Sequence, residues 1–206
     1  MFVKIVSTRY YMDMSKDTNA AHELIERLGN LIRADGRTVC NEYGMRPVQL
    51  EALGYLSQCN RYSDTPQAVA EFLGLTKGTV SQTLNVLEQK GLVRKQGDTK
   101  DKRIVHLKPT AKGLRLVNRA LPSTSLALGF AKLSKTESQV AVEQLRLILH
   151  SVQIANGLKT FATCHSCRFN MQREDGFICQ LTQERLSESD ITLLCREHQY
   201  PTVIAS

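Results

Sequence analysis

The chain has 206 residues, a formal net charge of +7 and a pI near 9.2. This length allows one substantial core with an appendage, or two modest domains. No apolar run approaches the roughly 20 residues that cross a bilayer, and the N-terminal stretch lacks the apolar block of a secretory signal. We therefore expect a cytoplasmic protein with no membrane partner, whose native start is Met1, Met12 or Met14.

The charge is distributed unevenly along the chain. Residues 76–119 carry 11 Lys or Arg against 3 Asp or Glu, whereas residues 164–206 carry 4 against 6. A basic surplus confined to the middle of the chain favours a polyanion, double-stranded DNA, as the partner. The alternative is a basic face that is merely solvated.

Two helices are predicted before this basic segment. Apolar residues recur at one-turn spacing over residues 18–34, which predicts an amphipathic first helix. Pro47 at a first-turn position begins a second helix that ends near Asn60.

A pair of short helices follows. Thr65 is a candidate N-cap with Pro66 in the first turn, and Gly74 ends that helix. Thr76 caps the next helix, which Gly91 ends. Its apolar positions recur at helical spacing and face a core, which leaves short or hydrogen-bonding side chains to approach base edges and phosphates. These candidate DNA-binding residues are Thr76, Lys77, Thr79, Ser81, Gln82 and Asn85.

Two strand-like runs, Leu92–Gln96 and Arg103–Leu107, come directly after the helix pair, and a polar tip with Gly97 joins them. A basic hairpin in this position is typical of a wing that contacts the DNA backbone or the minor groove. The candidate contacts of the wing are Lys100, Lys102 and Arg103.

Residues 46–113 resemble the MarR family of winged-helix transcription regulators. The resemblance rests on the segments PVQLEALGYL and TPQAVAEFLGLTKGTVSQTLNVLEQKGLV, and on the wing pattern that begins with Asp101 and Arg103 and continues through Leu107, Thr110 and Gly113. The family implies a homodimer that places one recognition helix in each of two successive major grooves. It also implies that Arg103 enters the flanking minor groove while Asp101 orients it or braces the wing. The resemblance does not indicate which bases this helix contacts.

A dimer has separate support from the sequence. Ser134 and Glu137 form a capping box, and apolar residues follow at alternating spacings of four and three. This face requires a partner, which is either a second copy of the chain or another part of the same monomer. A twofold homodimer predicts a near-palindromic operator with half-sites about one helical turn apart.

Four cysteines, Cys164, Cys167, Cys179 and Cys195, lie beyond the predicted dimerisation helix. Their thiolates suit an iron–sulfur cluster or zinc. The spacing resembles the ligand order of high-potential iron–sulfur proteins, which favours a cluster, with [4Fe-4S] as its candidate form, because it uses all four thiolates equally. Zn²⁺ is the alternative, with His198 as a candidate ligand that replaces Cys179. Metal-free thiol sensing ranks third.

The sequence therefore predicts a mainly α fold with a small β-wing: a winged helix-turn-helix dimer with a helical dimerisation region and a small C-terminal metal-binding segment. The expected divisions are residues 1–45 (N-terminal arm and dimerisation helix), 46–113 (winged helix), 114–160 (dimerisation helices) and 161–206 (cysteine-rich segment).

The predicted function is transcriptional regulation in which the cysteine segment senses redox state, oxygen, nitric oxide or iron and acts on the dimer helices. The chain shows no nucleotide loop, and its histidines form no nucleophile–base pattern, so we do not expect an enzyme. An iron–sulfur electron-transfer component, with the helix pair as a protein-interaction module, is the alternative of another class.

Overall fold

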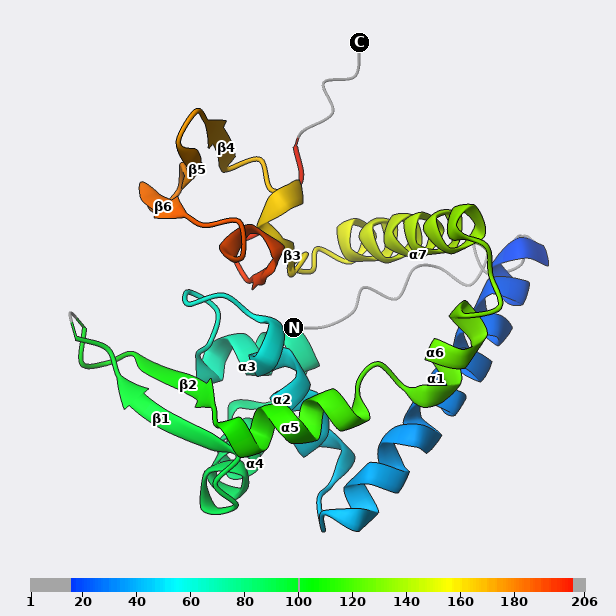
Figure 1. Ribbon diagram of the computed structural model, residues 1–206, viewed down its shortest axis with the longest axis horizontal. Helices are drawn as coiled ribbons and strands as arrows, with labels where there is room; N and C mark the ends of the chain where they lie inside the picture. Colours follow the sequence, from blue (N-terminus) through cyan, green and yellow to red (C-terminus); the bar gives the residue numbers. More distant parts are fainter. Residues whose placement is uncertain (1–15, 100, 202–206) are drawn as a thin grey trace, which may run out of the picture.

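The computed structural model describes residues 16–99 and 101–201. Lys100 and the candidate starts at Met1, Met12 and Met14 lie outside the described residues. The described chain is mainly helical, with a two-stranded wing and a small C-terminal region of short strands (Figure 1). None of its helices combines the length and apolar character needed to cross a membrane.

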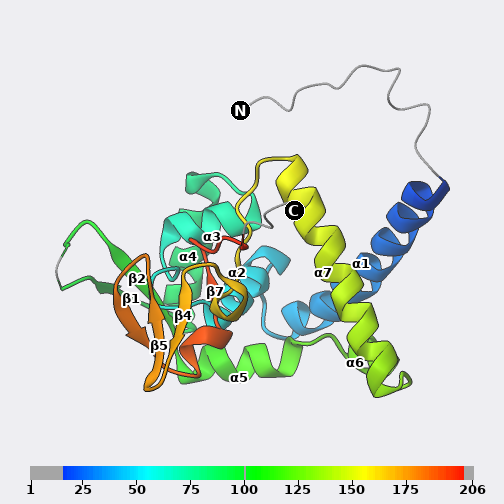
Figure 2. The ribbon, with the colours of Figure 1, turned by 90° about the horizontal axis from the view of Figure 1, so that it is seen from above.

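Two long helices extend to one end of the molecule (Figure 2). Helix α1 covers Lys16–Glu42 and is longer than the predicted segment, because residues near its C-terminal end, including Val39 and Cys40, pack against the core. Helix α7 covers Lys135–Ala155 and begins at the predicted capping box, in which Ser134 accepts from the Glu137 amide. No residue of α7 is buried. The apolar faces of both helices are therefore exposed in a single chain.

The predicted helix pair is confirmed with its caps. Helix α2 (Pro47–Gln58) precedes α3 (Pro66–Leu73), whose N-cap is Thr65. Gly74 ends α3 with a φ of 65°, a left-handed conformation that favours glycine. Helix α4 (Lys77–Gln89) begins at the cap Thr76.

The wing is an antiparallel hairpin of β1 (Val93–Gly97) and β2 (Val105–Pro109). The second strand begins two residues later than the sequence predicted. The difference arises at the tip, where the Ile104 amide donates to the Asp101 carbonyl at 2.9 Å and closes a turn over residues 101–104.

One apolar core joins the helix pair to the wing. The fully buried side chains of Leu53, Leu84, Leu87 and Leu107 come from α2, α4 and β2. Helix α5 (Ala111–Ala120) covers this core through Leu116 and Val117, and α6 (Thr124–Phe130) continues toward α1. The core therefore fixes α4 relative to the wing.

The C-terminal region has its own small cluster of buried residues, which includes Leu186, Ile191 and two cysteines. It lies beside α3 and the loop that precedes it (Figure 1). Its strands are β3 (Ala162–Thr163), β4 (Asn170–Arg173), β5 (Gly176–Cys179), β6 (Glu184–Leu186) and β7 (Leu194–Cys195). Strands β4, β5 and β6 form one antiparallel sheet, and β3 pairs with β7.

Gly113 allows α5 to approach the start of the wing. A Cβ atom at this position would lie 2.3 Å from the Leu92 carbonyl oxygen and 3.3 Å from Leu53. We expect Gly113→Ala to lower the free energy of unfolding by about 1–3 kcal/mol, because the backbone would have to shift. Denaturant unfolding at fixed protein concentration measures this change.

Gly129→Ala is the matched control, because a Cβ at Gly129 in α6 meets nothing within 4 Å. It should leave the stability unchanged or raise it slightly. Equal stability of the two variants would contradict the close approach at Gly113.

Candidate functional site

The predicted face of α4 is exposed. Helix α4 buries Val80, Leu84 and Leu87, so the opposite side faces outward. The hydroxyl of Thr76 accepts from the Thr79 amide at 3.2 Å, which makes Thr76 a helix cap as well as a candidate contact. The exposed residues include all the candidates of this helix, which are Thr76, Lys77, Thr79, Ser81, Gln82 and Asn85.

The wing holds Arg103 in a fixed orientation. Its Nε and Nη2 atoms donate to the two Asp101 carboxylate oxygens at 3.0 and 2.8 Å, and its side chain is 90% exposed. The hydrogen bonds from Arg103 lower the pKa of Asp101, so the pair stays charged. Asp101 thus presents a preorganised guanidinium to solvent, and Lys102 beside it is also exposed.

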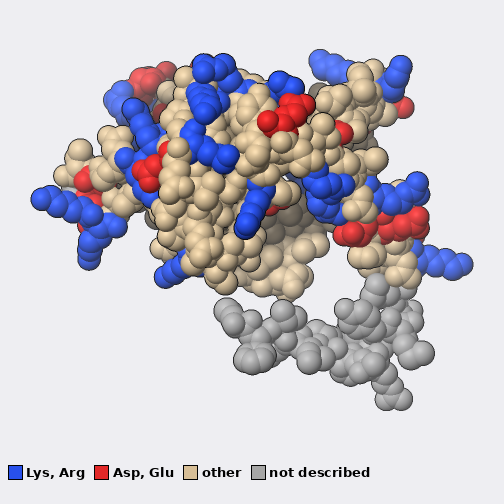
Figure 3. All heavy atoms as spheres, turned by 90° about the horizontal axis from the view of Figure 1, so that it is seen from below, with Lys and Arg blue, Asp and Glu red and all other residues tan. Residues whose placement is uncertain are grey.

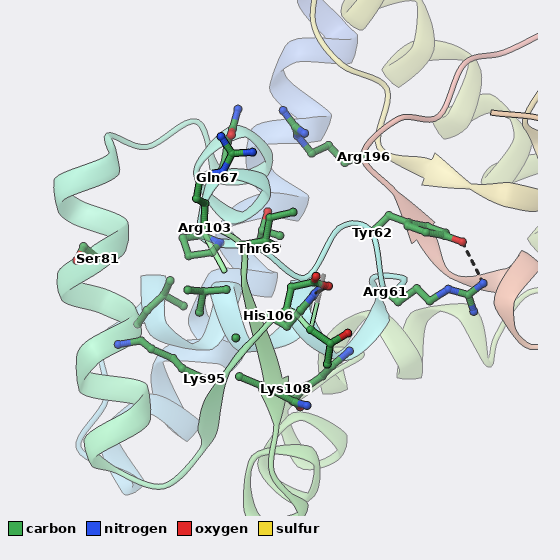
Figure 4. Close-up of a pocket in the computed structure, with 18 of the residues that line it drawn as sticks. Arg61, Tyr62, Thr65, Gln67, Ser81, Lys95, Arg103, His106, Lys108 and Arg196 are labelled. Carbon is green, nitrogen blue, oxygen red and sulfur yellow. Dashed lines mark hydrogen bonds and ion pairs between the residues drawn. The ribbon is translucent and has the colours of Figure 1, made fainter. Parts of the chain in front are cut away.

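A groove of about 910 Å³ separates the face of α4 from the wing. Figure 4 shows Ser81 on one side of this groove and Arg61 and Tyr62 on the other. Lysine and arginine side chains predominate over acidic ones on the face seen in Figure 3. The groove brings together four predicted residues, Lys77, Ser81, Asn85 and Arg103, and four cations that the sequence analysis did not single out, Arg61, Lys95, Lys108 and Arg196.

Two of these groove residues link the helix to the wing. Lys95 of β1 donates to the Asn85 Oδ1 at 2.7 Å and pairs with Glu88 at the same distance. The side chain of Asn85 is therefore held from the wing side. The polar face of α4 and the wing are therefore joined by a side-chain contact as well as by the shared core.

A buried carboxylate braces the wing from behind. Asp64, which is only 3% exposed, lies 2.5 Å from His106 Nδ1 and 2.5 Å from Lys108 Nζ. His106 Nε2 lies 3.0 Å from Asp98 at the wing tip. A weak sequence signal existed for this brace, because His106 and Lys108 flank the buried Leu107 in a strand and so lie on its other face.

The hydrogen bonds that His106 makes to the carboxylates of Asp64 and Asp98 raise its pKa above the ordinary value of 6.5. Protonated His106 therefore stabilises the wing at pH values below 6.5, and this contribution is lost as the pH rises through the raised pKa. We expect an NMR titration of His106 to show a pKa above 6.5.

Asp98→Asn should lower the pKa of His106, because it removes one of the two carboxylates. Asp175→Asn, on the exposed turn between β4 and β5, should not change it. Titration of wild-type His106 at or below 6.5 would rule out the brace.

All four predicted cysteines line one cavity in the C-terminal region. Cys164 and Cys195 are buried, and Cys167 and Cys179 are partly exposed. The walls include the apolar residues Phe169, Leu181 and Leu186. Over residues 16–99 and 101–201, no set of three or more His, Cys, Asp or Glu side chains is close enough together to hold a metal ion.

Cys164 and Cys195 both line the buried part of this cavity. Interaction between the two thiols raises the pKa of Cys164 and lowers that of Cys195. Thiolates are the form that binds metals.

His198 lies apart from the cysteine cavity. Its Nδ1 is 2.8 Å from the Thr160 hydroxyl, and its Nε2 is 3.1 Å from the Ser166 hydroxyl. Both ring nitrogens face hydroxyl groups, so His198 would have to leave one of these contacts to act as the ligand of the Cys3His alternative. His165, next to Cys164, is exposed.

Ion pairs dock the cysteine-rich region on the helix pair. Arg196 donates to both carboxylate oxygens of Glu71 in α3, at 2.6 and 2.8 Å, which lowers the pKa of Glu71 to about 2. Arg61 Nη2 lies 2.9 Å from Glu184, whose carboxylate also accepts from Tyr62. The region therefore contacts the DNA-binding candidate directly, which the sequence did not indicate.

Comparison with known proteins identifies the domain type. The model of the MarR family matches residues 43–104. A mutant of MepR from a multidrug-resistant S. aureus clinical isolate is 24% identical, with a TM-score of 0.56 over 65% of this chain and 97% of that chain. A MarR family protein from Bacillus stearothermophilus is 22% identical, with a TM-score of 0.55 over 68% of this chain and 99% of that chain.

The S. aureus MepR–DNA complex is also similar, at 24% identity and a TM-score of 0.49 over 63% of this chain and 96% of that chain. No curated protein matches the chain. The chain therefore has the winged-helix fold of the MarR family, and residues 43–104 are the part that matches the family model.

Proposed function

We propose that this protein is a transcriptional regulator that binds near-palindromic double-stranded DNA through α4 and the wing. The observation that carries the proposal is the groove in which the polar face of α4 meets the Asp101-braced guanidinium of Arg103. The helix supplies hydrogen-bonding side chains for a major groove, and the exposed guanidinium suits a narrow minor groove. The cations along the groove supply phosphate contacts.

The regulator acts as a homodimer. The exposed apolar residues of α1 include Leu24 and Leu31, which are 58% and 55% exposed. Those of α7 include Leu149 and Ile154, which are 57% and 65% exposed. The monomer leaves these faces open, although packing within one chain was the alternative explanation for them. A second copy of the chain would cover them, and its twofold axis would pair two recognition helices.

Arg103→Ala should weaken DNA binding about tenfold or more, because a charged contact of this kind contributes about 1.5–3 kcal/mol. The slope of log affinity against log salt should fall by about 0.9 for each phosphate that the variant no longer neutralises. Gel-shift titrations of the promoter fragment upstream of the gene, at several salt concentrations, measure both quantities.

Arg185→Ala is the matched control, since Arg185 also pairs with an aspartate, Asp175 at 2.9 Å, and does not line the groove. It should bind DNA as the wild type does. Equal DNA affinities of the Arg103 and Arg185 variants would refute the role of the wing. A wild-type protein that does not bind duplex DNA at low salt would refute the proposed regulatory function.

The four cysteines are proposed as ligands of an iron–sulfur cluster. Support comes from the four thiols that line one cavity with apolar walls, and from the contacts of both His198 ring nitrogens outside that cavity. Because the thiols are not close enough together to hold a metal ion in this structure, they would have to draw together around the cluster. Thiolates are the usual ligands of such clusters, and the bound group would supply redox chemistry that zinc lacks. Redox state, oxygen, nitric oxide and iron supply are the signals that such a centre responds to.

Anaerobic purification should give a coloured protein with broad absorption at about 400 nm and about four iron and four sulfide per chain. Cys179→Ser should remove this absorption, because it takes away one of four ligands. His165→Ala is the control that should retain it, since His165 is exposed. A colourless wild type with one zinc per chain would overturn the cluster in favour of the structural-zinc alternative.

A further inference from the structure

A short stretch of chain, residues 59–64 between α2 and α3, contacts both the cysteine cavity and the wing. We name it the junction loop. At the cavity, the Asn60 Nδ2 donates to the Cys164 sulfur at 3.7 Å, and the Asn60 amide donates to the Leu194 carbonyl at 2.9 Å. Asn60 is 3% exposed and lines the cavity. One end of the loop therefore contacts a predicted ligand directly.

Buried hydrogen bonds connect this end to the middle of the loop. The Ser63 hydroxyl donates to Asn60 Oδ1 at 2.7 Å and accepts from the Arg196 amide at 2.8 Å. The Ser63 carbonyl accepts from the Tyr55 hydroxyl at 2.8 Å. Ser63 is fully buried, so its hydroxyl would be left without an acceptor if Asn60 moved alone. A shift of Asn60 is therefore unfavourable unless Ser63 shifts with it.

The other end of the loop holds the wing. The Asp64 carbonyl accepts from the Leu107 amide at 2.7 Å, and the Asp64 carboxylate contacts His106. His106 contacts Asp98, whose Oδ1 accepts from the Asp101 amide at 2.7 Å. Asp101 in turn holds Arg103. The contacts thus run without a gap through Cys164, Asn60, Ser63, Asp64, His106, Asp98, Asp101 and Arg103.

We propose that the junction loop transmits a chemical change at the Cys164 sulfur to the wing. Asn60 is the positioning residue that contacts the cavity. This inference rests on the proposed function, because it assigns a regulatory route to the same site. A change at the Cys164 sulfur alters the acceptor of Asn60. The buried hydrogen bonds carry that change to Asp64 and so to the orientation of Arg103.

The contacts favour this route over one through the dimer helices. Toward α7, the region makes a ring contact between His150 and Tyr200, with centroids 3.9 Å apart, and a hydrogen bond from Gln153 to the Thr160 carbonyl. None of these four residues lines the cavity. The junction loop, by contrast, places the buried Asn60 in the cavity wall itself.

A double-mutant cycle of Cys164→Ser and Asn60→Ala tests the route in the full-length chain. The first readout is hydrogen exchange of the Asp98 and Leu107 amides, which requires neither DNA nor metal. The second is affinity for the promoter fragment. Each single variant should exchange these amides faster and bind DNA about tenfold more weakly, within the usual range of coupling between sites.

The double variant should resemble either single variant, because both changes break the same chain of contacts. Asn170→Ala is the matched control. Asn170 also lines the cavity but lies in β4, outside the junction loop, so its substitution should leave wing exchange unchanged. Additive effects in the cycle, or wing exchange that Cys164→Ser leaves unaltered, would overturn the proposal.

If the C-terminal region of the Cys164→Ser variant fails to fold, the Asn60→Ala variant by itself tests the route. Its wing amides should exchange faster while the amides of β4 and β5 stay protected, and unchanged wing exchange would refute the route. The two proposals fail in different measurements. The proposed function fails if the wild type has no affinity for DNA. The role of the junction loop fails if the hydrogen exchange of the wing amides does not change, and that measurement requires no DNA.

Discussion

The buried carboxylate of Asp64 is the constraint on which the arrangement of this protein depends. A charge removed from water is destabilising unless it is paired and hydrogen-bonded. Asp64 pairs its charge with His106 and Lys108, both from β2, and its Oδ1 shares a hydrogen bond with His106. Since Asp64 directly precedes the N-cap of α3, pairing its charge fixes the wing against the helix pair. The groove between α4 and the wing has its shape because of this pairing.

The same residue ends the junction loop, and this position links two regions with separate hydrophobic clusters. The core of the winged helix is formed by leucines of α2, α4 and β2, whereas the cysteine-rich region packs around Leu186 and Ile191. Between them lie polar contacts, above all the hydrogen bonds of Asn60 and Ser63. Polar contacts of this kind specify one geometry, because a shifted partner leaves a buried group unsatisfied.

Much of the winged helix could be predicted from the sequence, because its signals are local. Caps at Thr65 and Thr76, the glycine at Gly74 and the capping box at Ser134 each act within a few residues, and the structure has each of them where expected. The second wing strand was shifted by two residues, since a turn held by Asp98 and Asp101 has no periodic pattern.

The position of the cysteine-rich region could not be predicted from the sequence. Its docking depends on pairs such as Arg196 with Glu71 and Asn60 with Cys164, which are more than 100 residues apart along the chain. The order of the segments suggested an effect on the adjacent dimer helices. That effect stays a prediction, and the structure adds a second neighbour, because β7 returns to the loop before α3 and pairs there with Cys59. The cysteine cavity therefore adjoins the helix pair and the wing of its own subunit, so the proposed route from the cavity to Arg103 requires no change in the dimer interface.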